Sequence, residues 1–355
     1  MTATLELSPR EARRLAVRAQ LLTAARPAGI VETVYALGAV NIEPTAAIMP
    51  SADHILWSRL GWPYQPADLR QAVEVERDLF ELDGFYRLMS DLPLYRHDMA
   101  RRPRDEGTRQ WLHANDDFRR DVLARLRAEG PLHAAEVPDT AQVSWRSSGW
   151  THSRNAQQML EILVGTGEAA VWGRDAKGRL FDVAERVYPA DLPDVPEAAA
   201  RRERSERRLA ALGIAQPKTV GEDVGVPARV AGGREKWRVD AAALEATFAG
   251  RTVLVSPHDR VVADRARLQE LFGYEYVLEM YKPASQRRWG YFALPILHGD
   301  RFIGKLDAKA DRKAGVLRVH AVHEEDGFDD TAREAVQREI GDLAAWLGLE
   351  VQALA

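Results

Sequence analysis

Apolar positions recur every three or four residues over much of the first 250 residues, which is the spacing of amphipathic helices. A capping box formed by Ser8 and Glu11 precedes the run 12–25, and the run 30–37 stops at Gly38. The same spacing predicts further helices at 51–60, 66–78, 80–90, 116–129, 131–136, 153–165, 201–212, 240–248 and 331–347.

After residue 250 the pattern changes to short runs that are typical of strands. The two-residue link Gly299-Asp300 suits a tight hairpin between two of them. Together they indicate a small barrel-like or strongly curved sheet. The predicted strands of this region are 252–256, 274–281, 290–298, 301–308 and 315–323.

Residues 115–183 show three helices followed by two strands, 168–172 and 179–183, with a basic link between them. This order is typical of a winged helix, whose third helix usually enters a groove of DNA. The alternative is any other small α+β domain. Residues 190–196 predict a linker, and a strand at 235–239 fits a second, less regular unit.

Composition narrows the classes of protein. The chain of 355 residues contains no cysteine, which excludes disulfide scaffolds, iron–sulfur clusters and thiol nucleophiles. No apolar run is long enough to span a membrane, and the N-terminus lacks an apolar signal core. We therefore expect a cytoplasmic protein without membrane contact.

The net charge of −4 argues weakly against a nucleic-acid partner, but its distribution changes that picture. Residues 321–355 carry nine acids against Arg333 and Arg338, so the remaining chain has a net charge of +3. Arginine provides 42 of the 49 basic residues, and the first lysine is Lys177. A GC-rich genome produces the same arginine bias.

The C-terminal third carries the most specific motifs, SPHD at 256–259, GYFALP at 290–295 and GKLDAKADR at 304–312. They resemble the YcaQ/AlkZ-like family of winged-helix DNA glycosylases. Upstream, WSRLG at 57–61 and RVYP at 186–189 are similar to two further motifs of that family. The sequence departs from the family pattern at His258 (an aromatic residue in the family), Tyr274 (Phe), Gln286 (Lys) and Ile303 (Val).

The resemblance implies an α+β protein with tandem winged-helix domains and a small C-terminal β-barrel-like domain, arranged as a C-shaped clamp on duplex DNA. One chain completes such a clamp, so we expect a monomer. The resemblance implies four segments. They are an N-terminal winged-helix-like domain with the catalytic motif (1–110), a second winged-helix domain (111–190), a third winged-helix-like domain (191–249) and a β-rich domain with a terminal helix (250–355).

Family enzymes remove alkylated purines, including bulky and crosslinked N7 adducts. Their catalytic motif, Gln-Φ-Gln or Gln-Φ-Asp, aligns with Asn41-Ile42-Glu43. An N7-alkylated purine is cationic and leaves without protonation, so the enzyme needs chiefly a carboxylate that stabilises an oxocarbenium-like sugar and places a water. Glu43 fits that role, and Asn41 supplies an amide for the water or a phosphate. In an extended segment Ile42 would point away from both.

The alternative interpretation is that Asn41 and Glu43 are ordinary polar residues at a helix end and in a loop. Pro50 stands where the family commonly has an arginine, and no histidine lies between His54 and His97, ahead of the aligned Pro93. The rival function is a non-catalytic winged-helix DNA-binding protein, either a damage-recognition factor or a transcription regulator. It is supported by these two departures together with Asn41 and Glu43, which differ from the residues of the family motif. A third is a glycosylase with a changed lesion preference.

Residues 1–176 contain no lysine, and glycosylases that also cut the backbone usually use an amine nucleophile. We therefore predict a monofunctional glycosylase that leaves an abasic site. Histidine spacing and glycine-rich stretches predict neither a metal nor a nucleotide cofactor. We expect DNA to be bound chiefly by arginines, whose guanidinium groups pair well with phosphates. For each predicted contact a solvated surface role is the alternative, and for Trp150 a role in the core. The predicted DNA contacts are Arg59, Arg146, Trp150, Arg154, Arg174, Lys177, Arg179, Arg287 and Arg288.

Overall fold

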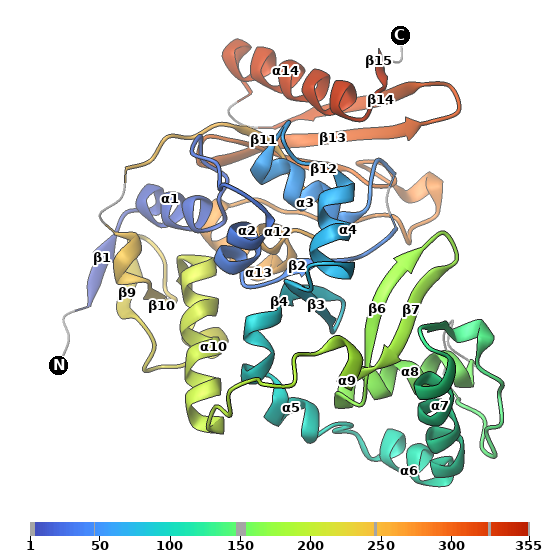
Figure 1. The fold of residues 1–355 in the computed structure, drawn as a ribbon. Coiled ribbons are helices and arrows are strands. Elements are labelled where there is room, and N and C mark those ends of the chain that lie inside the picture. The colour runs from blue at the N-terminus through green and yellow to red at the C-terminus, as the bar shows by residue number, and fades with distance from the viewer. Residues whose placement is uncertain (1–3, 46, 147–153, 245–246, 326–327, 354–355) are drawn as a thin grey trace. The chain divides into compact units, whose positions relative to one another are not determined.

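The structure is a computed structural model that describes residues 4–45, 47–146, 154–244, 247–325 and 328–353 (Figure 1). The chain divides into two compact units: unit 1 comprises residues 1–66 and 204–355, and unit 2 comprises residues 67–203. These units do not coincide with the four segments expected from the sequence, and that division stays a prediction. Among the described residues, no helix combines the length and apolar character needed to cross a bilayer.

The N-terminal part of unit 1 follows the predicted helices closely. The Ser8 hydroxyl accepts a hydrogen bond from the Glu11 amide at 3.3 Å, and Glu11 accepts one from the Ser8 amide at 2.7 Å. The first helix nevertheless ends at Ala19, before a left-handed Leu21 with φ of 56°. The elements are β1 (Leu5–Leu7), α1 (Pro9–Ala19), α2 (Ile30–Leu37), β2 (Val40–Asn41) and α3 (Ser51–Leu60).

A four-stranded sheet of unit 1 has the order β1-β9-β10-β8, in which β1 pairs parallel to β9. Leu7, Ile214 and Trp237 are buried in its core. The helix predicted at 240–248 is reduced to a 3-10 turn in the described part of that range. The elements are α10 (Glu197–Leu212, which begins in unit 2), β8 (Ile214–Ala215), α11 (Pro217–Val220), β9 (Val226–Val230), β10 (Lys236–Val239) and η3 (Ala241–Ala243).

The C-terminal sheet of unit 1 has the order β11-β12-β13-β14-β15, with register shifts at Ile296/Leu297 and Asp307/Ala308. Its two edge strands, β11 and β15, are not paired with each other, so the sheet is bulged and open rather than a closed barrel. Helix α14 packs against both edge strands (Figure 1). The strands are β11 (Thr252–Leu254), β12 (Leu294–His298), β13 (Arg301–Asp311), β14 (Val316–Glu324) and β15 (Glu350–Ala353).

The strand predicted at 274–281 is wrong. The segment alternates as a strand does, but its aromatic side chains turn inward and bind distant backbone. The hydroxyl of Tyr274 donates to the carbonyl of Gly304 at 2.8 Å, and that of Tyr276 donates to Ala293 at 2.7 Å. The helices of this region are α12 (Arg260–Ala263), α13 (Arg265–Phe272), η4 (Ala284–Gln286) and α14 (Asp330–Trp346).

The helix predicted at 80–90 is also wrong, because these residues form an antiparallel hairpin. Asp83 and Gly84 make its turn with φ of 56° and 75°. An Asp-Gly pair tolerates two successive left-handed residues, which such a tight turn requires. The elements are α4 (Pro66–Glu74), β3 (Leu79–Leu82), β4 (Phe85–Leu88), η1 (Met89–Leu94), α5 (Arg96–Ala100) and α6 (Glu106–Ala114).

The rest of unit 2 has two long helices and a hairpin at the predicted positions, around a core that includes Phe118, Leu160 and Phe181. The sheet order is β5-β7-β6. Residues 131–136 form a short strand and a 3-10 turn instead of the expected short helix. The elements are α7 (Asp116–Glu129), β5 (Leu132–His133), η2 (Ala134–Glu136), α8 (Asn155–Thr166), β6 (Ala169–Asp175), β7 (Gly178–Val183) and α9 (Ala184–Val187).

Candidate functional site

The Asn41–Glu43 segment of unit 1 forms a polar turn that begins at the last residue of β2. The side-chain oxygen of Asn41 accepts a hydrogen bond from the Glu43 amide at 2.9 Å, and Glu43 Oε1 accepts one from the Thr45 amide at 3.0 Å. Ile42 is 9% exposed, whereas Asn41 and Glu43 are half-buried. The two polar residues therefore keep part of their surface in solvent while the residue between them packs inward.

Backbone hydrogen bonds fix the loop that follows this turn. The Ser51 amide donates to the Glu43 carbonyl at 3.0 Å, and the Ala310 amide of β13 donates to the Ala47 carbonyl at 2.9 Å. Pro50 precedes α3 as its N-cap residue. Where the family commonly has an arginine, this chain therefore has a proline that begins a helix and provides no polar side chain.

Arg59 is not accessible for the predicted DNA contact, because its side chain lies in the core of unit 1. Its side chain is fully buried and forms an ion pair with Asp259, with Nη2 3.1 Å from Oδ1. Its Nε donates to the carbonyl of Gln20 at 3.0 Å. The motifs WSRLG and SPHD therefore meet in the core of unit 1, where Arg59 joins α3 to the loop before α12.

His258, in the SPHD motif, is the residue that sequence reasoning passed over, although its replacement of an aromatic residue was a visible signal. Its amide donates to Ser256 Oγ at 3.3 Å, and its ring lies 5.9 Å from that of Phe292. Burial lowers the pKa of His258; the Glu43 carboxylate opposes this shift, and the Arg265 guanidinium adds to it. His258 thus lies within electrostatic range of Glu43.

A basic pocket of about 880 Å³ in unit 1 includes Ala47, from the loop that follows the Asn41–Glu43 turn. Burial raises the pKa of Asp307 inside it, opposed by His320, His323 and Arg287. The charged and aromatic residues that line it are Arg287, Arg288, Tyr291, Asp307, Lys309, His320 and His323.

Gly290 is required where the segment 282–291 crosses β13. Its φ is 105°, and a Cβ at this position would overlap the carboxylate of Asp307. Any side chain at residue 290 would therefore have to shift the Asp307 carboxylate, and the backbone there would be strained.

Arg287 and Arg288 rest on aromatic rings. The Arg287 guanidinium lies 5.0 Å from the ring centroid of Tyr291, and that of Arg288 lies 4.1 Å from Trp289. Within the described ranges neither makes an ion pair. Arg287 Nε donates to the Lys282 carbonyl at 2.9 Å, and the remaining N–H groups of such stacked guanidiniums can bind phosphates.

The arginines of the unit 2 hairpin are engaged differently. Arg174 and Arg179 both pair with Glu81, at 2.6 and 3.0 Å, and Glu81 is only 4% exposed. Arg179 also pairs with Glu161. These ion pairs occupy N–H groups of both arginines, so we expect the two residues to contribute little to DNA binding.

Three other predicted DNA contacts, Arg146, Arg154 and Lys177, are exposed in unit 2. Arg154 immediately precedes α8, and Lys177 lies in the turn between β6 and β7. Trp150 lies outside the described residues.

Comparison with known proteins shows the family of the chain. A model of the AlkZ-like DNA glycosylases matches residues 34–346. The chain belongs to the AlkZ-like DNA glycosylase family. A solved structure, the DNA glycosylase AlkZ of Streptomyces sahachiroi, matches with a TM-score of 0.62 and 14% identity over 99% of this chain and 100% of that chain. At that identity the likeness shows a shared mixed α+β fold.

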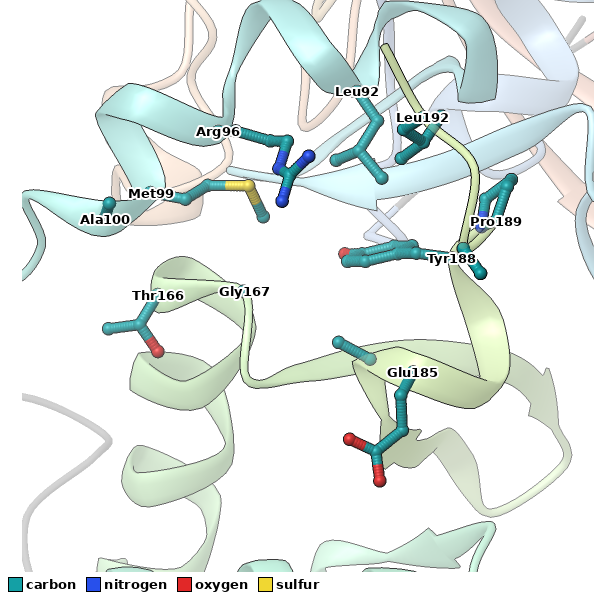
Figure 2. Close-up of a pocket in the computed structure, with 12 residues that line it drawn as sticks. Leu92, Arg96, Met99, Ala100, Thr166, Gly167, Glu185, Tyr188, Pro189 and Leu192 are labelled. Carbon is teal, nitrogen blue, oxygen red and sulfur yellow. The ribbon is translucent and has the colours of Figure 1, made fainter. Parts of the chain in front are cut away.

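The AlkZ-like region also contains a second pocket, of about 380 Å³, within unit 2 (Figure 2). The Tyr188 ring and the Arg96 guanidinium point into it. Burial raises the pKa of Tyr188. Arg186, in the same RVYP motif, donates to the Leu126 carbonyl at 3.0 Å and pairs with Asp182 at 3.1 Å. The RVYP motif therefore stabilises the end of α7. None of the predicted site residues lines the pocket.

No group of three or more histidine, aspartate or glutamate side chains with the geometry of a metal site occurs among the residues that the structure describes.

Proposed function

We propose that this AlkZ-like protein is a DNA glycosylase that hydrolyses the N-glycosidic bond of alkylated, N7-modified purines in duplex DNA, bulky and crosslinked adducts included. The observation that carries the proposal is the Asn41–Glu43 turn. A carboxylate and an amide, both half-buried, flank an inward-facing Ile42 on a loop held by backbone hydrogen bonds to α3 and β13.

The chemistry that this turn supports is simple. The C1′–N9 bond of the cationic base breaks, and its electron pair leaves with the base, which becomes neutral. Glu43 stabilises the positive charge that develops on the sugar and accepts a proton from the water that adds to C1′. Asn41 uses its oxygen to hold the turn, so its two N–H groups remain to bind the water or a phosphate.

The arrangement of unit 2 supports duplex DNA as the partner. Helix α7, strand β5, the η2 turn, helix α8 and the β6–β7 hairpin follow one another in the order of a winged helix, with the sheet order β5-β7-β6. In that arrangement the helix equivalent to α8 enters the major groove and the hairpin lies beside it. Arg154 and Lys177 would then bind the DNA from the helix start and the hairpin tip.

We infer that the enzyme is monofunctional and leaves an abasic site. The motif lies in the lysine-free part of the sequence, residues 1–176. Folding nevertheless brings Lys309 to the pocket that includes Ala47. Lys309 is therefore the amine to test: Lys309→Ala is expected to leave base release intact, and wild-type protein is expected to cut no DNA backbone. Backbone incision that disappears in Lys309→Ala would contradict a monofunctional enzyme.

The rival is a non-catalytic DNA-binding protein on the same scaffold. The observation in its favour is that Asn41 and Glu43 each accept a hydrogen bond from a backbone amide of the same turn with one side-chain oxygen. Such bonds would occur equally in a loop without catalytic function.

The experiment that separates them uses duplexes with a single N7-methylguanine or a bulky N7 adduct, and an undamaged duplex as control. Alkali after incubation converts abasic sites to breaks. We expect breaks at the lesion only after alkali, and none in the control. Tight binding without base release across the panel would overturn the proposal and favour the rival.

A further inference from the structure

The pocket of about 380 Å³ in unit 2 has the size and the lining of a site for a small organic molecule. Such sites measure about 300 to 1,000 Å³ and combine an apolar lining with a few polar groups. Here leucine, methionine, proline and alanine side chains provide most of the lining. All of the lining residues belong to unit 2, and neither Asn41 nor Glu43 is among them. The proposed function therefore leaves this pocket without a role.

Hydrogen bonds fix the backbone around the pocket. The Tyr188 amide donates to the Ala184 carbonyl at 2.8 Å. The chain that continues from Tyr188 is tied back to α5, because Nε2 of His97 lies 2.9 Å from the Val195 carbonyl oxygen. The pocket is therefore formed by the fold itself, as binding sites for small molecules usually are. Its walls come from three segments, 92–100, 166–167 and 184–192 (Figure 2).

Arg96 is the charged group that the pocket offers to a ligand. Its guanidinium points into the pocket (Figure 2), and it makes no ion pair with any residue that the structure describes. The other charged lining residue, Glu185, points away from Arg96 (Figure 2) and pairs with Arg127 at 3.1 Å. The pocket thus presents one uncompensated positive charge, which favours a monoanion.

The Tyr188 ring and its neighbours favour an aromatic body for that anion. The Tyr188 hydroxyl is inaccessible to solvent, so a ligand would meet the carbon atoms of the ring and not the hydroxyl. Leu92 and Met99 extend toward the same space (Figure 2). Aromatic rings and thioethers both make favourable contacts with a further aromatic ring. A flat apolar molecule therefore matches this lining.

We propose that this pocket binds a small aromatic carboxylate, with the carboxylate on Arg96 and the ring against Tyr188 and Met99. A guanidinium matches a carboxylate because two parallel N–H groups can donate to its two oxygens. A body of one or two rings suits a pocket of this size. The inference does not depend on the proposed glycosylase function, since it requires neither DNA nor the Asn41–Glu43 turn.

The test uses the full chain and two probes with the same ring system, 1-naphthoate and the neutral 1-naphthalenemethanol. Isothermal titration calorimetry should show one naphthoate per chain with a Kd on the order of 0.1 mM, as for other ligands of this size. The alcohol should bind about 5- to 10-fold more weakly, because it lacks the charge that pairs with Arg96. Naphthoate that binds no more tightly than the alcohol, or that does not bind at millimolar concentration, would overturn the proposal.

Two variants locate the binding site. Arg96→Gln should weaken naphthoate binding about 5- to 10-fold and change the affinity for the alcohol by less than about twofold. Ala190→Trp places a large side chain at an exposed position of the lining and should abolish binding of both probes. The matched control is Arg109→Gln, which changes an exposed arginine of α6 outside the pocket and should retain both affinities.

Thermal unfolding without a probe shows that each variant is folded, and naphthoate should raise the Tm of the wild type because it binds the folded chain. The proposal is wrong if naphthoate binds equally to the wild type, Arg96→Gln and Ala190→Trp, because the molecule then binds elsewhere. It is also wrong if Arg96→Gln weakens the two probes equally, because the guanidinium then does not pair with the carboxylate.

Discussion

Two pairs of arginines, both predicted to contact DNA, differ sharply in their surroundings. Arg174 and Arg179 of the unit 2 hairpin pair with Glu81, which is 93 residues or more away in the sequence and almost completely buried. Arg287 and Arg288 of unit 1 stack on Tyr291 and Trp289 and make no ion pair among the described residues. A basic residue in a sequence is therefore not yet a charge available to a ligand.

The two environments assign different physical roles to the same side chain. Removing one partner of a buried ion pair leaves an uncompensated charge, which destabilises the fold. Removing an exposed arginine costs little stability and instead weakens binding to phosphates in a salt-dependent way. Stabilising the fold and binding phosphate should therefore be separable by mutation.

The largest effect is expected from Glu81→Gln. This change leaves Arg174 without its carboxylate and Arg179 with Glu161 alone. We expect unfolding of unit 2 to become easier by about 2 to 4 kcal/mol, below the range for fully buried pairs because both arginines are partly exposed, measured by chemical denaturation. Glu129→Gln, which removes an exposed pair with Arg125, should change stability by less than about 0.5 kcal/mol. Equal effects of the two variants would remove the distinction between the arginine pairs.

A half-buried carboxylate of unit 1, Glu339, provides the contrast to Glu81. Burial raises the pKa of Glu339 to about 7, Arg251 and Arg26 oppose the shift, and Asp342 adds to it. The folded state therefore binds a proton more tightly than the unfolded state, and stability is lost as the pH rises from about 4.5 to about 7. The loss should reach about 3 kcal/mol and be absent in Glu339→Gln, by thermal unfolding at pH 5 and pH 8. A pH dependence identical in wild type and variant would show that Glu339 titrates normally.

Substituting both Arg287 and Arg288 with alanine should weaken DNA binding about 10- to 30-fold at moderate salt and reduce the salt slope by about 2, while the protein stays folded. Fluorescence anisotropy over a salt series measures both quantities. The matched double variant, Arg174→Ala with Arg179→Ala, should lower stability and change the affinity of the folded protein by less than about threefold. An equal loss of DNA affinity in the two double variants would contradict the distinction between the two arginine pairs.

The smallest effect is expected at the tip of the unit 2 hairpin. Lys177 is exposed, unlike the two arginines at either side of it. Lys177→Ala should reduce DNA affinity about two- to fivefold and the salt slope by about 1, and Lys177→Arg should retain both. An unchanged salt slope in Lys177→Ala would mean that the hairpin has no DNA-binding role at all.

Local signals predicted much of the secondary structure. The helix 30–37 and its stop at Gly38, the helix 116–129 before Gly130, and the Gly299-Asp300 hairpin are all confirmed. Each has a cap or turn residue whose effect acts within a few positions. The hairpin at 79–88 was missed because helical spacing was given more weight than the Asp-Gly pair in its middle.

Long-range partners set the limit of what the sequence could predict about the site. The exposure pattern of Asn41, Ile42 and Glu43 followed from alternation alone. The burial of Arg59 did not, because Asp259 lies 200 residues further along the chain. The electrostatic interaction of His258 with Glu43 was equally hidden, although the departure of His258 from the family pattern marked the residue. Sequence spacing can indicate candidate functional residues, but the fold determines which of these residues interact.

The central claim is that the Glu43 carboxylate releases the base. The most direct test is the single-turnover rate of N7-methylguanine release by wild type, Glu43→Asp and Glu43→Gln with enzyme in excess. We expect Glu43→Gln to lose about 100- to 10,000-fold in rate at unchanged DNA affinity, and Glu43→Asp to retain measurable release. A Glu43→Gln rate equal to that of the wild type would contradict the account.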